Sequence, residues 1–150
     1  MGKVLLAVGL QKAKRAGNEK KFDMICNYFD SHAGEYNLAV NIVRVKNHMN
    51  HNSSSKDDII NKGDKVNACV MQGITHELHG FTLNNPEMFP MQHEYYIIGG
   101  SLSFAILALA FQMYGAGYNV KVLSKYTFDR KGTDKEAEKI FKAYMPDVLI

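Results

Sequence analysis

The sequence predicts an α/β fold: a three-layer α/β/α sandwich with a mainly parallel sheet of about six strands. Short, continuously apolar runs recur along the chain, which is typical of strands that are buried on both faces. Amphipathic helical segments separate several of these runs, and strands connected in this way pair in parallel. Because the chain has 150 residues, we expect a single domain over residues 1–150.

The composition excludes several classes of function. Hydrophobic residues make up 46% and charged residues 22% of the chain, as in an ordinary globular protein. The net charge of +3 is too small to indicate nucleic-acid binding without a local basic patch. The longest apolar run, residues 104–111, is about half of a membrane span, and the N-terminal residues show no secretory signal. We therefore expect a cytoplasmic protein that binds neither nucleic acid nor membrane.

The first half of the chain predicts three strands and one helix. Residues 3–8 (KVLLAV) form a buried strand that Gly9 ends. A helix follows from Asn18, because apolar residues recur at positions i, i+3, i+4 and i+7. These residues are Phe22, Ile25, Cys26 and Phe29. Residues 38–45 and 66–71, which are rich in β-branched side chains, predict the second and third strands.

A long irregular segment separates the two halves of the chain. Residues 72–93 contain two glycines and two prolines, and loops of this length in small domains usually have a function. A fourth strand over residues 95–98 ends at the pair Gly99-Gly100. The next helix spans residues 103–114, with Ser103 placed as its N-cap.

The C-terminal part predicts a strand, a helix and an edge strand. The strand covers residues 118–124. Thr133 and Glu136 have the spacing of a capping box and open the helix. The apolar face of this helix consists of Ala137, Ile140, Phe141 and Tyr144. Residues 148–150 predict a strand at the edge of the sheet.

The predicted parallel sheet also indicates where a ligand binds. In open α/β sheets, ligands bind outside the carboxyl ends of the strands, where the strand order changes direction. Those ends are Gly9 and residues 45–48, 72–75 and 99–103.

Two segments of the second half resemble one family. Residues 96–110 (YIIGGSLSFAILALA) and 117–122 (GYNVKV) resemble the isochorismatase-like, or nicotinamidase-like, cysteine hydrolases, whose pattern is a strand, G-V-x-T-D-x-C-V, a helix and G-Y-x-V-x-V. Residues 4–11 (VLLAVGLQ) look like the first strand of that family with its D-x-Q. Residues 75–81 (THELHGF) look like its K-x-x-Y-S-x-F segment, and residues 133–150 like its last helix and strand. The resemblance covers nearly all of the chain and implies a Rossmann-like fold.

The resemblance also implies a degenerate catalytic triad. The family uses an aspartate base, an assisting lysine and a nucleophilic cysteine. The matching positions here are Gly9, Thr75 and Ala105. Triad members act as a unit, and nucleophilic catalysis needs an activated lone pair that alanine does not have. We therefore expect a catalytically inactive protein, which either binds or sequesters a ligand or acts through oligomer or partner contacts, and no cofactor.

The family's pocket implies the residues that would line a ligand site: Gln11, Thr75, His76, His79, Phe81, Gly100, Ser101, Ser103 and Phe104. A basic stretch follows the first strand and consists of Lys12, Lys14, Arg15, Lys20 and Lys21. Such a stretch is usually a solvated face, but near a helix N-terminus it can attract an anion. We expect a small anionic or nucleotide-like ligand.

An active hydrolase with relocated chemistry is the alternative. Ser101 or Ser103 would be the nucleophile, and His76 or His79 in the facing segment would be the base. This arrangement needs the histidine within hydrogen-bond reach of the serine. A serine near a helix start more often caps the helix.

Metal binding is only weakly indicated. His48 and His51 follow the second strand at i, i+3 spacing, near the place where nicotinamidases of the family carry their metal ligands. No carboxylate accompanies them at the expected position, and two histidines alone make a poor site. Cys26 and Cys69 are too far apart for a zinc motif and fit reduced, buried thiols.

The helix over residues 103–114 predicts self-association. Phe104, Leu107, Phe111 and Tyr114 form a stripe at helical spacing, of which we expect at least part to be core. Because this helix is apolar on nearly every face, one sheet does not cover it fully. The resemblance implies subunit contacts at this helix, and we expect a homo-oligomer.

Overall fold

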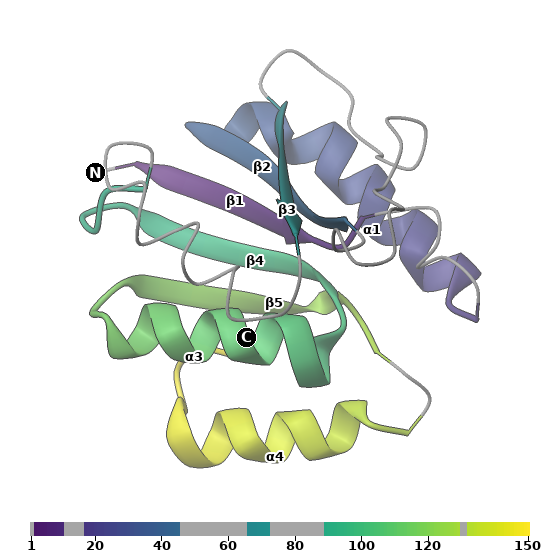
Figure 1. The fold of residues 1–150 in the computed structure, drawn as a ribbon, viewed down its shortest axis with the longest axis vertical. Helices are drawn as coiled ribbons and strands as arrows, with labels where there is room; N and C mark the ends of the chain where they lie inside the picture. The colour runs from purple at the N-terminus through teal and green to yellow at the C-terminus, as the bar shows by residue number, and fades with distance from the viewer. Residues whose placement is uncertain (1, 11–16, 46–65, 73–88, 130–131) are drawn as a thin grey trace.

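The computed structural model describes residues 2–10, 17–45, 66–72, 89–129 and 132–150 (Figure 1). The elements are β1 (Lys3–Val8), α1 (Glu19–His32), β2 (Leu38–Val45), β3 (Val66–Gln72), β4 (Glu94–Gly100), α3 (Leu107–Gly115), β5 (Asn119–Phe128) and α4 (Asp134–Tyr144). A 3-10 turn, Ala33–Glu35, follows α1, and a π-helical turn, Leu102–Ile106, precedes α3. The predicted polar loop over residues 47–58 lies outside the described residues.

The described strands form one parallel sheet in the order β3-β2-β1-β4-β5 (Figure 1). The segment over residues 148–150 adds a single parallel bridge, between Val122 and Leu149, instead of a sixth strand. The predicted fold class is confirmed. Three strands run further than predicted at their carboxyl ends: β3 to Gln72, β4 to Gly100 and β5 to Phe128.

The strand order places a switch point between β1 and β4. The chain moves outward from β1 to β2 and β3, then returns to pair β4 with the opposite side of β1. The carboxyl ends of these two central strands meet, because Val8 pairs with Gly99. This edge is the usual place for a ligand in such a sheet.

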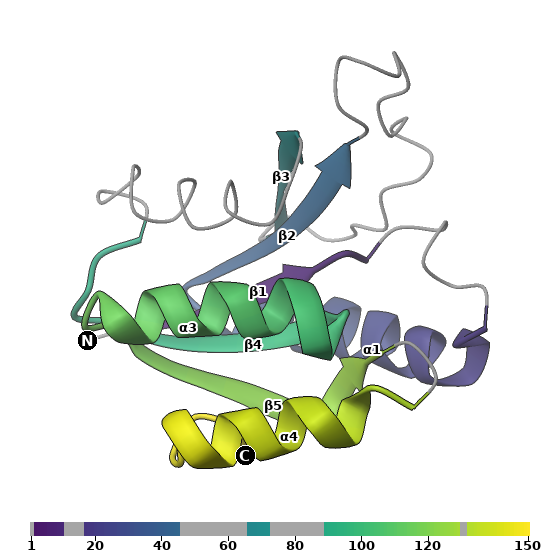
Figure 2. The same cartoon turned by 60° about the horizontal axis from the view of Figure 1, so that its bottom comes forward.

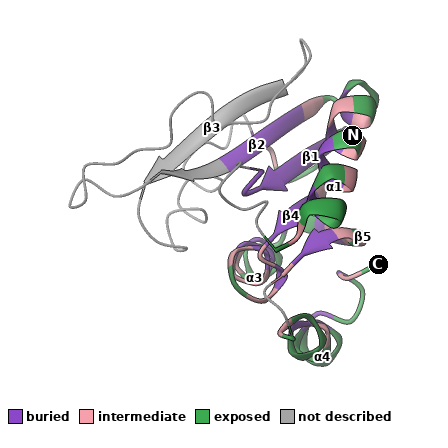
Figure 3. Cartoon of the chain, turned by 90° about the vertical axis from the view of Figure 1, so that its right-hand side faces the viewer, coloured by how far each residue is buried: buried purple, intermediate pink, exposed green. Residues whose placement is uncertain are grey.

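Helices cover both faces of the sheet. Helix α1 lies on one face, and α3 and α4 lie on the other (Figures 2 and 3). The four residues predicted for the apolar face of α1 are all buried, and they pack with Leu5 and Ala7 of β1. Val4, Leu6 and Val8 of the same strand belong to the core under α3 and α4. Burial on both faces explains why β1 is apolar without alternation.

The predicted apolar stripe of α3 is not the buried face. Phe104, Phe111 and Tyr114 are 57%, 41% and 46% exposed, and only Leu107 packs partly against the core. The buried residues of this segment are Leu102, Ile106, Leu109, Ala110 and Met113. Because the helix is apolar nearly all round, periodicity did not identify the face that meets the sheet.

Two of the four residues predicted for the buried face of α4 are buried. Ala137 and Phe141 are buried, whereas Ile140 and Tyr144 are exposed. The helix lies at the side of the sheet beyond β5 (Figure 3), so only a narrow stripe of it meets the core. A narrow stripe needs only the i, i+4 pair of residues.

Candidate functional site

Gly9, at the carboxyl end of β1, has no room for a side chain. Its φ is +71°, in the left-handed region that glycine adopts without strain. A Cβ atom built on Gly9 would lie 2.8 Å from the carbonyl oxygen of Gly100. Main chain therefore occupies the space that a carboxylate at position 9 would need.

Glycines also bring the end of β4 close to its neighbours. Gly99 has a φ of +108°, and a Cβ there would overlap the backbone of Val8. A Cβ on Gly100 would lie 2.6 Å from the ring of Phe128. The absence of side chains at glycines 9, 99 and 100 thus allows the end of β4 to pack closely against β1 on one side and β5 on the other.

The turn between β4 and α3 is helical from its first residues. The peptide bond between Gly100 and Ser101 is cis, and the π-helical turn starts directly after Ser101. The carbonyl oxygen of Ser101 accepts hydrogen bonds from the backbone N–H groups of Phe104 (3.3 Å) and Ile106 (3.0 Å). The prediction that Ser103 is the N-cap is wrong, because Ser103 lies inside the turn.

Asp129 holds this turn through one carboxylate. Its Oδ1 accepts hydrogen bonds from Ser101 Oγ at 2.9 Å and from Ser103 Oγ at 2.8 Å. Its Oδ2 accepts a third from the backbone N–H of Ser103 at 3.0 Å. The carboxylate thus satisfies a backbone donor at the start of the helical segment, which the expected serine cap does not do.

Sequence reasoning missed Asp129. The predicted strand ended at Ser124, which placed residue 129 in a connection of no special interest. The real strand runs to Phe128, so Asp129 lies at the same carboxyl edge as Gly9 and Gly100. The sequence did contain a signal for Asp129, since an aspartate directly after a parallel strand is a candidate ligand-site residue at the carboxyl edge of the sheet.

The capping box at the start of α4 is only partly present. The helix begins at Asp134 with Thr133 at the N-cap position, as predicted, but no side chain caps it. Thr133 Oγ1 instead lies 3.3 Å from Ser103 Oγ. The start of α4 is thereby connected to the β4–α3 turn.

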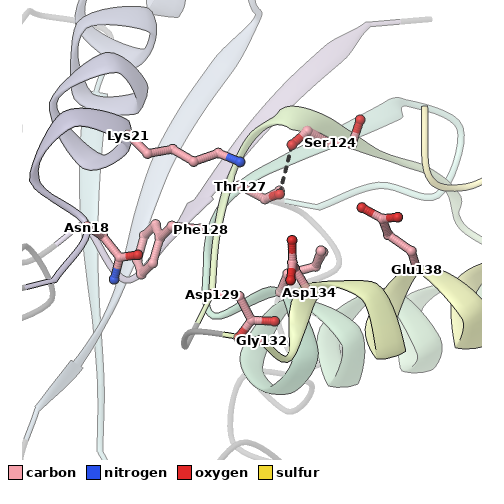
Figure 4. A pocket seen from close by; sticks show the side chains of 10 residues that line it. Asn18, Lys21, Ser124, Thr127, Phe128, Asp129, Gly132, Asp134 and Glu138 are labelled. Carbon is pink, nitrogen blue, oxygen red and sulfur yellow. Dashed lines mark hydrogen bonds between the residues drawn. The ribbon is translucent and has the colours of Figure 1, made fainter.

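A shallow pocket of about 220 Å³ opens beside Asp129 (Figure 4). Lys21 reaches in from α1, and Asp134 and Glu138 come from α4 (Figure 4). Leu102 forms part of the lining, as does the ring of Phe128. Among the described residues that line the pocket, one carries an ammonium group and three, counting Asp129, carry a carboxylate.

The structure brings part of the predicted site together. Gly9, Gly100, Ser101 and Ser103 meet at one edge through the contacts above. Ala105 lies in the π-helical turn and packs partly against the core, whereas Phe104 is exposed. Several candidates lie outside the described residues, namely Gln11, His48, His51, Thr75, His76, His79 and Phe81, and so do Lys12, Lys14 and Arg15.

The described residues contain neither a cluster of metal-ligating side chains nor a membrane-spanning helix. Within the described ranges, no group of three or more His, Cys, Asp or Glu side chains is arranged to hold a metal ion. Cys26 is on the buried face of α1, and Cys69 is in β3, at the opposite side of the sheet from β5. No helix in the described part of the chain is long and apolar enough to cross a membrane.

The hydrogen bonds of the turn do not resemble a nucleophile with its base. Both serine hydroxyls donate to the carboxylate of Asp129, and neither is bonded to a histidine among the described residues. The N–H groups of Ser103, Phe104 and Ile106 are already bonded within the protein. An oxyanion hole needs such donors free and aimed at the substrate.

The fold is that of a known class, the α/β proteins with the isochorismatase-like fold. No family model matches the sequence, and no curated protein matches it. The solved structures do show similarity. A pyrazinamidase of Pyrococcus horikoshii in complex with zinc superposes with a TM-score of 0.73 at 12% identity, over 99% of this chain and 98% of that one.

Two further structures give the same result. A nicotinamidase from Bacillus subtilis matches with a TM-score of 0.72 at 13% identity, over 99% of both chains. An isochorismatase-like hydrolase from Alkaliphilus metalliredigens matches with a TM-score of 0.69 at 12% identity, over 100% of this chain and 94% of that one. The resemblance found in the sequence is therefore confirmed at the level of the fold.

Proposed function

We propose that this protein is a binding protein with the isochorismatase-like fold and that it does not catalyse the hydrolysis performed by cysteine enzymes of this fold. The contact between position 9 and the Gly100 carbonyl carries the proposal. A base at the end of β1 would need a side chain where main chain lies. Ala105 supplies no thiol in the turn that follows β4.

The binding role is supported by the topology and by the turn. The edge between β1 and β4 is where parallel sheets of this kind take their ligands, and the turn there is held by Asp129 in a defined conformation. A fixed polar turn of this kind is typical of a preorganised site. The ligand expected from the sequence was a small anion or nucleotide. Of the described residues, only Lys20 and Lys21 support that expectation.

The test is an assay of hydrolysis. The full chain is incubated with nicotinamide, pyrazinamide and isochorismate, and release of ammonia or pyruvate is measured. We expect no release above that of a preparation from cells carrying the empty vector. The double variant Ser101→Ala/Ser103→Ala is the matched control for the alternative of a serine hydrolase. Turnover by the wild-type chain that this variant loses would overturn the proposal in favour of that alternative.

A second role is favoured by the exposed aromatic residues of α3 and α4. Phe111 and Tyr144 are both exposed, and their ring centroids are 6.0 Å apart. Exposed apolar side chains that are contiguous usually mark an interaction surface. We propose that this surface joins two copies of the chain.

A further inference from the structure

The exposed aromatic surface of α3 and α4 begins in the β4–α3 turn. Phe104 belongs to this turn and is exposed. It precedes Phe111 by seven residues, the spacing at which two residues return to the same face of a helix. The ring of Phe111 is 6.0 Å from that of Tyr144, and the two helices lie side by side (Figures 1 and 3). The surface therefore includes residues of the turn, of α3 and of α4.

Asp129 fixes the backbone that carries Phe104. Its carboxylate accepts hydrogen bonds from the hydroxyl of Ser101 and from both the hydroxyl and the backbone N–H of Ser103. The backbone N–H of Phe104 donates in turn to the carbonyl oxygen of Ser101 at 3.3 Å. The position of the Phe104 ring therefore depends on Asp129, although the side chain of Asp129 is not part of the aromatic surface.

The same hydrogen bonds connect the turn to α4. Ser103 Oγ also lies 3.3 Å from Oγ1 of Thr133, the residue that precedes α4. Asp129 itself follows the last residue of β5. The end of β5, the start of α4 and the turn before α3 are therefore joined at one point, which holds the two helical parts of the surface in one arrangement.

The charge of this surface favours a second copy of the chain as its partner. Residues 102–115, which include α3, contain no Asp, Glu, Lys or Arg. On α4, the exposed Lys139 and Glu136 pair with each other at 3.7 Å. In a two-fold symmetric pair, residues near the axis face copies of themselves, so a charged helix would meet its own charge. An uncharged helix avoids this repulsion, whereas it offers a charged partner nothing to pair with.

We propose that Asp129 is a positioning residue for self-association, because it holds the β4–α3 turn so that Phe104 completes the surface that joins two copies. This inference rests on the dimer proposed above and names a residue that controls its affinity. Asp129 acts through Ser103 and Phe104 and does not itself contact the second copy. The carboxyl edge of the sheet and the dimer surface thus share one turn, so a change in that turn alters the affinity between the copies.

The experiment measures the dissociation constant of the dimer by sedimentation of the full chain over a dilution series. We expect Asp129→Ala to weaken the dimer roughly tenfold, as for the loss of hydrogen bonds to a charged group. Ser103→Ala retains the backbone N–H bond to Asp129, so we expect a smaller loss. Ser124→Ala is the matched control, because it removes a hydroxyl bond to the carbonyl oxygen of Ile150, away from the turn. We expect this control to change the dissociation constant less than about twofold.

A double-mutant cycle shows whether Asp129 acts through Phe104. Phe104→Ala should also weaken the dimer roughly tenfold, because it removes a ring from the surface. If Asp129 acts by placing that ring, Asp129→Ala adds little in the Phe104→Ala background. Asp129→Asn keeps an oxygen that can accept from the backbone N–H of Ser103, so we expect it to retain most of the affinity.

The outcomes separate this inference from the dimer itself. A monomeric wild type rejects the dimer and the inference with it. A dimer that Asp129→Ala leaves unchanged overturns the positioning role alone, and so does an equal effect of Asp129→Ala with and without Phe104. Equal losses in Asp129→Asn and Asp129→Ala would assign the effect to charge and would also overturn it. If circular dichroism shows that Asp129→Ala does not fold, Ser103→Ala takes its place in the cycle.

Discussion

Position 9 offers the sharpest test at the scale of single residues. The substitution Gly9→Asp places a side chain on a residue with a φ of +71°, with its Cβ 2.8 Å from the Gly100 oxygen. We expect a loss of about 2 kcal/mol or more in the free energy of unfolding, from backbone strain and from displacement of β4. The measurement is the midpoint of urea unfolding.

Gly34→Asp is the matched control for this substitution. A Cβ at Gly34 meets nothing within 4 Å, and its φ is not in the left-handed region. We expect a change within about 0.5 kcal/mol, as at an ordinary surface position. Equal losses in the two variants would contradict the steric argument.

The same contact predicts that the triad is not restored by substitution. In the triple variant Gly9→Asp/Thr75→Lys/Ala105→Cys, the carboxylate at position 9 lies out of place unless the Gly100 carbonyl moves. Catalysis requires placement within about 0.5 Å. We expect no turnover of nicotinamide, and a thiol pKa at position 105 near the ordinary value of about 8.5, measured by alkylation across pH. Turnover with a thiol pKa below about 7 would show that the catalytic geometry is intact.

Buried tyrosines predict instability at alkaline pH. Burial raises the pKa of Tyr95 and of Tyr118 above the ordinary value of 10.0, and their hydroxyls donate to the carbonyls of Pro90 and Phe89. Below about pH 10 both states of the chain keep these protons; above it the unfolded chain loses them first. Stability is therefore lost as the pH rises from about 10.

Urea unfolding at pH 8, 10 and 11 measures this loss, and Tyr95→Phe provides its control. The phenylalanine variant has one hydroxyl fewer to ionise, so its stability should fall less steeply with pH than that of the wild type. An identical slope would show that Tyr95 does not contribute.

At the residue scale, sequence reasoning found the glycine and the serines but not their partner. Gly9, Ser101 and Ser103 lie in segments that resemble the family's motifs, so they could be placed at the strand ends. The prediction of Asp129 would have required knowing where β5 ends. The pairing of β4 with β5 shifts register between Ile97 and Gly99, so the end of β5 cannot be located from the sequence pattern. The hydrophobic pattern of one strand does not determine its pairing register, because register depends on the neighbouring strand.

Among the elements, α3 gives a prediction that separates its two faces. Met113 is fully buried, whereas Phe111 is 41% exposed. Met113→Ala should cost about 2–5 kcal/mol of unfolding free energy, because it leaves a cavity in the core. Phe111→Ala should cost far less in dilute protein. Both are measured by urea unfolding, and the opposite order would mean that the predicted stripe does face the core.

The elements themselves were largely predictable, and their orientation was not. The bounds of β1 and β2 and the buried face of α1 follow from apolar periodicity, because each has one clear pattern. The segment that contains α3 is apolar at almost every position, so its sequence did not show which residues meet the sheet. The π-helical turn before it, Leu102–Ile106, has no signature in that pattern.

For the whole molecule, the exposed aromatic surface of α3 and α4 predicts a dimer. We expect light scattering at micromolar concentration to give at least twice the mass of one chain, 16.9 kDa. Phe111→Ser combined with Tyr144→Ser should return the mass to that of a monomer, because both rings lie on this surface. A matched change elsewhere, Met91→Ser, which is also exposed, should leave the dimer intact. A monomeric wild type would reject the surface as an interface.

The last three residues described, Val148–Ile150, have a consequence for how copies of the chain meet. Their backbone accepts the N–H groups of Val122 and Ser124, at 2.7 and 2.8 Å, along the outer side of β5. An open strand edge is a template on which another polypeptide can add, and proteins that leave such edges bare tend to aggregate. We expect this short segment to prevent another chain from pairing with that part of β5. A chain shortened by those three residues should scatter light increasingly with time while its sheet is still folded.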